Sequence, residues 1–394
     1  FGLNGAFLTG DLFNLFVFFE ILLLASYGLL LHGGGRLRTM AGLHFVIINL
    51  VGSILFLFAV GTLYGLLGTL NMADLAVKVA DVSSENIALI RTAGLLLFAV
   101  FALKAALLPL YLWLPAAYAH TSAPIAALFA IMTKVGAYSI LRIYTLIFGE
   151  HAGPLANLIQ PWLLPLALAT LIAGVLGVLA STRLRQQVAY LVVASVGTLL
   201  IALGINTNAG IAAGLYYLPH STFAAAAFFL LADGIANRRG EMSDRFEPGL
   251  IMTHQRITGA LFFMVAVLVA GLPPLSGFVG KFLILQAALS HAALPWIMAI
   301  VLITSLFTII ALVRSGSLLF YRAQAPQAIH PATDVHIRPS ITPDINGLAI
   351  TACLLALCVA LMIWAGAIIE FVQATANQLL QPDDYIQSVL GIEK

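Results

Sequence analysis

Residues 101–142, FALKAALLPLYLWLPAAYAHTSAPIAALFAIMTKVGAYSILR, decide the fold class of this chain. The stretch is apolar enough to cross a membrane twice, but Lys104 and Lys134 lie inside the apolar runs and prolines, the first of them Pro109, interrupt them. An ammonium group at the bilayer centre costs about 2.5 to 3.5 kcal/mol on insertion scales. A proline frees an upstream carbonyl, which a membrane helix tolerates only inside protein or beside a wet cavity. Lysines beside a broken helix therefore indicate an ion or proton site.

The composition agrees with an integral membrane protein. Of the 394 residues, 61% are hydrophobic and 9% are charged, whereas a soluble domain carries about 25% charged residues. The high hydrophobic fraction makes the lipid bilayer the expected surrounding. The net charge of +2 is too small to indicate nucleic acid or an acidic partner. Cys353 and Cys358 lie in one apolar run without the spacing of metal ligands.

The sequence lacks the short motifs of redox and nucleotide enzymes. It contains no glycine-rich phosphate loop and no Cys/His cluster. We therefore expect no metal and no cofactor in this chain, and expect any redox chemistry to belong to another subunit.

Apolar segments of about 20 residues, the length that crosses a bilayer core of about 30 Å, follow one another along the chain. We expect about ten of them, near 8–31, 41–68, 92–119, 122–149, 161–181, 187–206, 209–233, 257–290, 295–321 and 346–371. The chain starts at Phe1, without a methionine or a signal-peptide pattern, which favours a fragment that lacks its natural N-terminus.

Basic residues in the predicted loops collect on one side of the membrane. Arginines follow the first, fifth, seventh and ninth predicted spans, at positions Arg36, Arg38, Arg183, Arg185, Arg238, Arg239, Arg245, Arg256, Arg314, Arg322 and Arg338. The opposite loops are acidic or neutral, and the tail with Asp383 and Asp384 lies on that side. Because cytoplasmic loops are enriched in lysine and arginine, the arginine side is expected to be cytoplasmic.

Lysine is used in the membrane rather than at its rim. The chain has five lysines, of which Lys104, Lys134 and Lys281 lie in predicted spans and Lys78 and Lys394 lie outside them. Arginine is effectively always protonated, whereas lysine readily changes its proton affinity on burial. This distribution predicts lysines that load and release protons.

A carboxylate and a second helix break accompany the lysines. Glu20 lies in the middle of the first span, where a carboxylate needs a cation, and Lys104 is the expected partner. Gly271, Pro273, Pro274 and Gly277 interrupt a second helix just before Lys281, and paired interruptions in two halves are typical of inverted-repeat transporters.

Two histidines are weaker candidates than the lysines. His220 lies beside a proline inside a span, and histidine as a residue type ordinarily titrates near neutrality, which suits a proton relay better than a packing role. His120, near a helix end on the cytoplasmic side, fits the proton path and an interface equally well.

These segments resemble a known family. LTGDLFNLFVFFEILLLASYGLL, the stretch quoted above, RLRQQVAYLVVASVG and GLPPLSGFVGKFLI are similar to the antiporter-like subunits shared by respiratory complex I and the Mrp-type multisubunit cation/proton antiporters, most of all to the Mrp subunits called MnhD or PhaD. The resemblance covers essentially the whole chain. It implies an all-α fold of fourteen helices with two five-helix inverted repeats, of which this chain would supply helices five to fourteen.

The resemblance also implies a division of the chain and a set of roles. Residues 1–150 would form the first repeat without its earliest helices, residues 151–325 the second, and residues 326–394 a C-terminal helix and tail. Glu20, Lys104, Lys134, His220 and Lys281 would form one proton-transfer chain, with helix breaks at Pro109, Pro273 and Pro274. Many relatives carry a lysine where this chain has Ala225, which weakens the link between Lys134 and Lys281.

The implied function is a subunit of a Na⁺ or K⁺/H⁺ antiporter in the bacterial cytoplasmic membrane, assembled with other membrane subunits. A proton-pumping subunit of an NADH:quinone oxidoreductase or a membrane-bound hydrogenase is the alternative. In either case the chain is expected to be a transport subunit without a redox centre of its own. A purely structural scaffold would not need three lysines in the membrane.

Overall fold

A computed structural model describes residues 1–249, 251–322 and 345–391. Every long element in this part of the chain is a helix. The α-helices are α1 (Gly2–Leu8), α2 (Leu12–Leu31), α3 (Arg36–Leu67), α4 (Met72–Ala80), α5 (Ile87–Ala105), α6 (Trp113–His120), α7 (Ala123–Phe129), α8 (Met132–Leu146), α9 (Gln160–Ala180), α10 (Leu184–Gly204), α11 (Asn208–Arg239), α12 (Gln255–Ala270), α13 (Ser276–Ala287), α14 (Leu294–Gly316), α15 (Ile345–Ile363), α16 (Ala365–Leu380) and α17 (Asp383–Leu390). The all-α prediction is confirmed for these residues.

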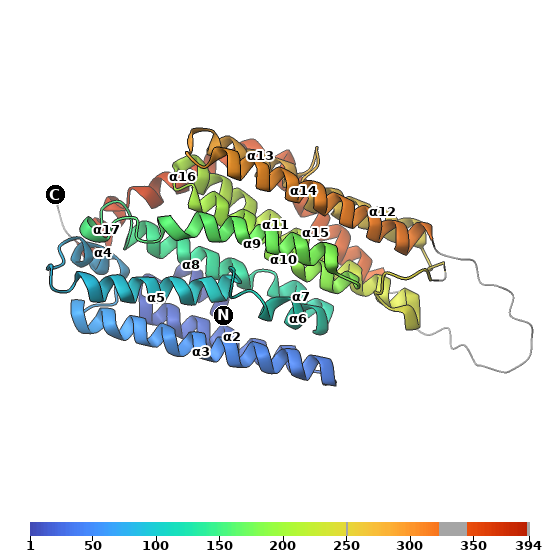
Figure 1. Ribbon diagram of the computed structural model, residues 1–394, viewed down its shortest axis with the longest axis horizontal. Helices are drawn as coiled ribbons and strands as arrows, with labels where there is room; N and C mark the ends of the chain where they lie inside the picture. The colour runs from blue at the N-terminus through green and yellow to red at the C-terminus, as the bar shows by residue number, and fades with distance from the viewer. Residues whose placement is uncertain (250, 323–344, 392–394) are drawn as a thin grey trace, which may run out of the picture.

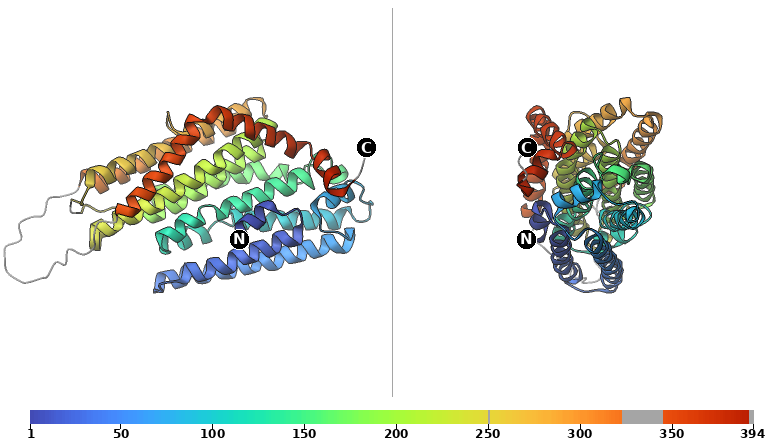
Figure 2. Two further views of the ribbon diagram at one scale, coloured as in Figure 1. Left: turned by 180° about the vertical axis from the view of Figure 1, so that it is seen from behind. Right: turned by 90° about the vertical axis from the view of Figure 1, so that its left-hand side faces the viewer.

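The long helices lie side by side along the longest axis of the molecule (Figure 1). Helices α2, α3 and α5 lie on one side, and α12, α13 and α14 lie on the other. Helices α10 and α11 lie between them, since α10 packs against α6, α8, α9 and α11, and α11 packs against α7, α13 and α15. The end-on view in Figure 2 shows these helices as one packed bundle.

Helices lie in all ten predicted spans, but four of these spans, 92–119, 122–149, 257–290 and 346–371, are each divided between two helices. Eight helices in the described residues are long and apolar enough to cross a membrane, and the bent pair α15–α16 makes up to nine. The predicted span 257–290 consists of two shorter apolar helices, α12 and α13, because the Gly/Pro stretch between them ends one helix and begins the next. The chain is therefore a multi-pass membrane protein.

The connection between α5 and α6 contains Pro109 and is closed by polar side chains. The amide of Leu108 donates to Oγ1 of Thr170 at 2.9 Å, and the carbonyl of Leu103 accepts from Nε1 of Trp113 at 3.1 Å. Backbone groups freed at a break need such partners, because the hydrocarbon region offers none. Pro273 and Pro274 lie in the corresponding connection between α12 and α13.

The arginine-bearing loops meet at one end of the bundle, which we call the arginine end. Nε of Arg38 donates to the carbonyl of His120 at 2.9 Å, Arg185 pairs with Asp233, and Arg183 forms a backbone bridge with Arg245. Helices α4 and α17 contact each other at the opposite end (Figure 1). Of the sequence predictions, Arg338, Lys394 and the boundary at residue 326 lie outside the described residues.

The buried apolar side chains form two clusters that follow one another along the helix axes. The first includes Phe19, Phe56, Val135 and Tyr217 and extends to the α4 end. The second lies on the same helices toward the arginine end and includes Leu23, Phe45, Met132 and Ala224. On each helix the change from one cluster to the other brackets a short stretch with polar side chains. We call this stretch, repeated on α2, α3, α8, α11 and α14, the polar layer.

Candidate functional site

All five residues predicted to transfer protons lie in or beside the polar layer. Glu20 lies between Phe19 and Leu23 of the two clusters, and Lys134 lies between Met132 and Val135. His220 lies between Tyr217 and Ala224. Lys104 lies at the end of α5. Lys281 lies on α13, which follows α12, and the last residue of α12 in the second cluster is Leu268.

Glu20 and Lys104 contact neighbouring turns of α3 rather than each other. The hydroxyl of Ser53 donates to Oε1 of Glu20. Nζ of Lys104 donates to Oδ1 of Asn49 at 3.2 Å and lies 3.4 Å from the carbonyl oxygen of the same residue. Positions 49 and 53 are one helical turn apart and share a face of α3.

A direct ion pair was expected between Glu20 and Lys104, and the structure differs on this point. The ion pairs within 4.0 Å among the described residues are Lys78–Asp74 and Arg185–Asp233. The polar face of α3 provides the buried Lys104 and the half-buried Glu20 each with a neutral hydrogen-bond partner instead. Such partners matter because a buried charge without hydrogen bonds is very costly.

Replacing Asn49 by alanine should slow transport by about 10- to 100-fold, because a hydrogen bond to a charged group contributes about 1.5–3 kcal/mol. Cation-dependent dissipation of a pH gradient in vesicles measures the effect. Thr62→Val is the matched control, since Thr62 lies on the exposed part of α3 and bonds only its own helix at the carbonyl of Phe58. Equal rates for the two variants would exclude a role for Asn49.

Lys134 is completely buried and lies at the third position of α8. Its Nζ donates to Oγ of Ser195 on α10 at 3.1 Å. The sequence placed this lysine inside one span, and α7 and α8 together do form one span, but Ala130 and Ile131 separate the two helices just before it. Lys134 therefore stands next to a helix interruption, as Lys104 and Lys281 do.

His220 and Lys281 both contact the second broken helix. Nδ1 of His220 is 3.0 Å from Oγ of Ser276, the first residue of α13. Nζ of Lys281 donates to the carbonyl of Ala270, the last residue of α12, and to Oγ of Ser305 on α14, both at 2.9 Å. The break thus provides a carbonyl partner for the ammonium group that an unbroken helix would not.

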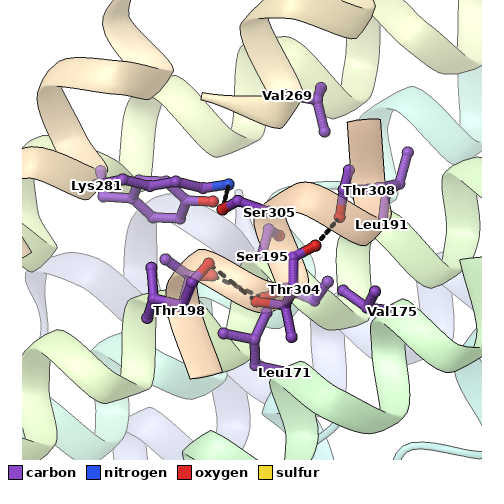
Figure 3. Close-up of a pocket in the computed structure, with 13 residues that line it drawn as sticks. Leu171, Val175, Leu191, Ser195, Thr198, Val269, Lys281, Thr304, Ser305 and Thr308 are labelled. Carbon is purple, nitrogen blue, oxygen red and sulfur yellow. Dashed lines mark hydrogen bonds between the residues drawn. The ribbon is translucent and has the colours of Figure 1, made fainter. Parts of the chain in front are cut away.

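A cavity of about 30 Å³ lies beside Lys281. Figure 3 shows Lys281 pointing toward Ser305, with the hydroxyl-bearing side chains of Thr198 and Thr304 and that of Ser195 around the same space. A second cavity of about 20 Å³ is lined by His220, Ser195 and Ser221 among others. A buried water needs a cavity on the order of 10–15 Å³ and two to four polar partners, so both cavities fit water.

Two glycines allow the elements of the site to approach one another. A Cβ at Gly136 of α8 would lie 2.5 Å from the amide nitrogen of Ala105, next to Lys104. A Cβ at Gly277 of α13 would overlap the carbonyl oxygen of Leu268 and lie 3.0 Å from Cε1 of His220. Side chains at these two positions would separate the lysine-bearing helices from their neighbours.

His120 is the one site candidate that lies away from the polar layer. It is the last residue of α6, its Nδ1 lies 2.8 Å from the carbonyl of Ala116, and its own carbonyl accepts from Arg38. It also lines a pocket at the arginine end together with Arg183 and Arg185. The structure thus brings His120 together with arginines of the loops and not with the lysines.

The family profile described as NADH:quinone oxidoreductase/Mrp antiporter, TM, matches residues 9–308 of the chain. A relative from Rhizobium meliloti (strain 1021), named as the D-type subunit of a probable K(+)/H(+) antiporter, is 40% identical over 418 residues, which cover 99% of this chain and 75% of the relative. The chain belongs to the MnhD family of Mrp antiporter subunits. A Na(+)/H(+) antiporter subunit of the same type from Bacillus subtilis (strain 168) is 38% identical, with 99% of this chain and 76% of the relative covered.

The fold of this MnhD family member is also similar to a solved structure. A chain in the structure of the Mrp complex from Dietzia sp. DQ12-45-1b superposes with a TM-score of 0.85 at 28% identity, over 99% of this chain and 78% of that chain. The similarity confirms the predicted fold of an antiporter-like subunit.

Proposed function

We propose that the chain conducts protons within a multisubunit Na⁺ or K⁺/H⁺ antiporter of a bacterial cytoplasmic membrane, together with other membrane subunits. The observation that carries this proposal is the polar layer. Glu20, Lys134 and His220 lie between the two apolar clusters along their helices, and Lys104 and Lys281 lie beside the layer at helix breaks. Relatives named as K⁺/H⁺ and Na⁺/H⁺ antiporter subunits support the two candidate ions.

The proposed route crosses the bundle rather than following one helix. A proton passes from the Glu20 and Lys104 region to Lys134, and from there to His220 and Lys281 in the other half. Residues 1–150 and 151–325 would be the two repeats, each with one broken helix, followed by the C-terminal segment from residue 326. The arginine end would face the cytoplasm, because basic loops are retained on that side.

The membrane potential is large enough to drive the entry of a proton into the polar layer from one side of the membrane and its exit to the other side. Moving one elementary charge across the membrane corresponds to about 2.3 kcal/mol per 100 mV. That is more than the roughly 1.4 kcal/mol that changes an equilibrium tenfold. Inward proton movement through the layer can therefore drive the export of a cation by the assembled complex.

The test uses everted vesicles from an antiporter-deficient bacterium that expresses this chain with its operon partners. The vesicles are energised to form a pH gradient, and Na⁺ and then K⁺ are added. We expect one of the cations to dissipate the gradient, which identifies the ion. The alternative, a subunit of a redox-driven pump, predicts no response to either cation and proton pumping linked to quinone reduction by the assembled complex.

A further inference from the structure

Between Lys134 and Lys281, the polar layer has a stretch in which none of the five proposed proton-transfer residues lies. Lys134 is on α8 in one half, and Lys281 contacts α12 and α14 in the other. Between them lies α10, and its Ser195 is the residue that Lys134 contacts. Transfer from one half to the other must cross this helix.

Ser195 also lies where the two cavities of the second half meet. The cavity beside Lys281 and the cavity beside His220 have four lining residues in common, which are Leu191, Ser195, Tyr217 and Val269. Ser195 carries an aliphatic hydroxyl, which can donate one hydrogen bond and accept two. Leu191 and Val269 have no polar side chain, and Tyr217 carries a hydroxyl, but the hydrogen bond of Lys134 is to Ser195. The side chain of Ser195 thus contacts Lys134 of the first half and lines both cavities of the second half.

We propose that the Ser195 hydroxyl is the transfer group between the halves, with one water in each adjoining cavity. One branch leads through the larger cavity to Lys281, and the other leads through the smaller cavity to His220. This inference rests on the proposed proton-conducting function. It adds to it a residue and two water sites at the point where none of the five residues of the proposed chain lies.

The transfer leaves the hydroxyl and the water unchanged. The Lys134 ammonium gives a proton to Oγ of Ser195 as the hydroxyl proton leaves for the water, and the water gives one proton to the neutral amine of Lys281. Lys134 ends neutral and Lys281 ends as an ammonium. The hydroxyl at present donates to the carbonyl of Val192 at 2.7 Å. Rotation about the Cβ–Oγ bond directs it into a cavity instead.

The lining of both cavities provides the partners that a buried water needs. The larger cavity is lined by Lys281 and by the hydroxyls of Thr198, Thr304 and Ser305 besides Ser195. The smaller cavity is lined by His220, Ser221 and Ala225. Because the side chain at position 225 is only a methyl group, space for water remains where a long side chain would fill it.

The test compares Ser195→Ala with Ser195→Thr in the full complex, with antiport measured in everted vesicles. Alanine removes the hydroxyl and should lower the rate by about 10- to 100-fold, the range expected for a lost hydrogen bond to a charged group. Threonine keeps a hydroxyl on the same carbon and should restore most of the rate. Ser139→Ala is the matched control, since Ser139 is buried on α8 and bonds its own helix at the carbonyl of Val135.

The outcomes separate this inference from the proposed function when Lys134→Ala is measured in parallel. Loss of antiport in Lys134→Ala with a normal rate in Ser195→Ala would overturn the role of Ser195 alone. Equal loss in the alanine and threonine variants of Ser195 would assign the effect to packing and would also overturn it. A normal rate in Lys134→Ala would instead contradict the proposed function itself.

Discussion

Replacement of Lys104 by alanine should abolish antiport, with a rate at least about 100-fold below that of the wild type. A positioned group that transfers a proton contributes typically 10²- to 10⁴-fold, and Lys104 occupies the end of α5 between the Glu20 region and Lys134. Nothing else on α5 carries a titratable group in the polar layer, because its other charged residue, Arg91, lies in the first turns of the helix. The rate of cation-dependent gradient collapse measures the loss.

The control for this prediction is Lys78→Ala. Lys78 lies on α4 and pairs with Asp74 at 3.0 Å at the end of the bundle, outside the polar layer. Both variants should insert and assemble normally, which membrane content and co-purification of the partner subunits report. Wild-type antiport by Lys104→Ala, in vesicles where the protein is present at the normal level, would remove Lys104 from the path.

Replacement of Gly277 by alanine should destabilise the protein and disturb the second half of the site. The new methyl group would overlap the carbonyl oxygen of Leu268 and press on the ring of His220. Extra methyl groups in a packed interior cost about 1–3 kcal/mol and sometimes more. We expect a lower midpoint temperature of unfolding in detergent and a lower antiport rate.

Gly61→Ala is the matched substitution without the steric conflict. Gly61 lies inside α3, and a Cβ there would meet nothing within 4 Å. Alanine is a better helix former than glycine by about 0.8–1.0 kcal/mol, so this variant should be as stable as the wild type or more stable. If Gly277→Ala unfolds at the same temperature as Gly61→Ala, α13 does not pack against α12 as described.

The residues that break the hydropathy pattern were predictable from the sequence. Lys104, Lys134 and Lys281 each add a charge to an apolar run, and Pro109 and Pro273 each stop a helix. Each of these residues can therefore be recognised in the sequence without knowledge of the residues that it contacts. The spans and the arginine side follow from the same contrast. These features depend only on the residue type and on the apolar run around it, and both can be read from the sequence.

The partners of these residues were not predicted. Asn49, Ser53, Ser195 and Ser305 are small polar residues inside helices, and a single hydroxyl or amide changes the hydropathy of a span very little. The spacing of Asn49 and Ser53 by four residues was the one available signal, because it places both on one helix face. Which charged residue each of them contacts depends on the packing of separate helices and cannot be seen in the sequence.

Two helix interruptions also left no sequence signal. The interruption between α7 and α8 occurs at Ala130 and Ile131, and the bend of 77° between α15 and α16 occurs at Trp364. None of these residues is glycine or proline. Tertiary contacts set both positions, since α7 packs against α11, and α16 packs against α11 and α8.

The bend at Trp364 sends the C-terminal segment across the bundle to α8. The guanidinium of Arg142 lies over the ring of Tyr385 on α17, 4.5 Å from its centroid. Arg142 and Lys134 are on the same helix, eight residues apart, which corresponds to about 12 Å at a rise of 1.5 Å per residue. Helix α8 thus connects the C-terminal segment to the polar layer. A protein that binds α17 would contact the segment that packs on the helix carrying Lys134.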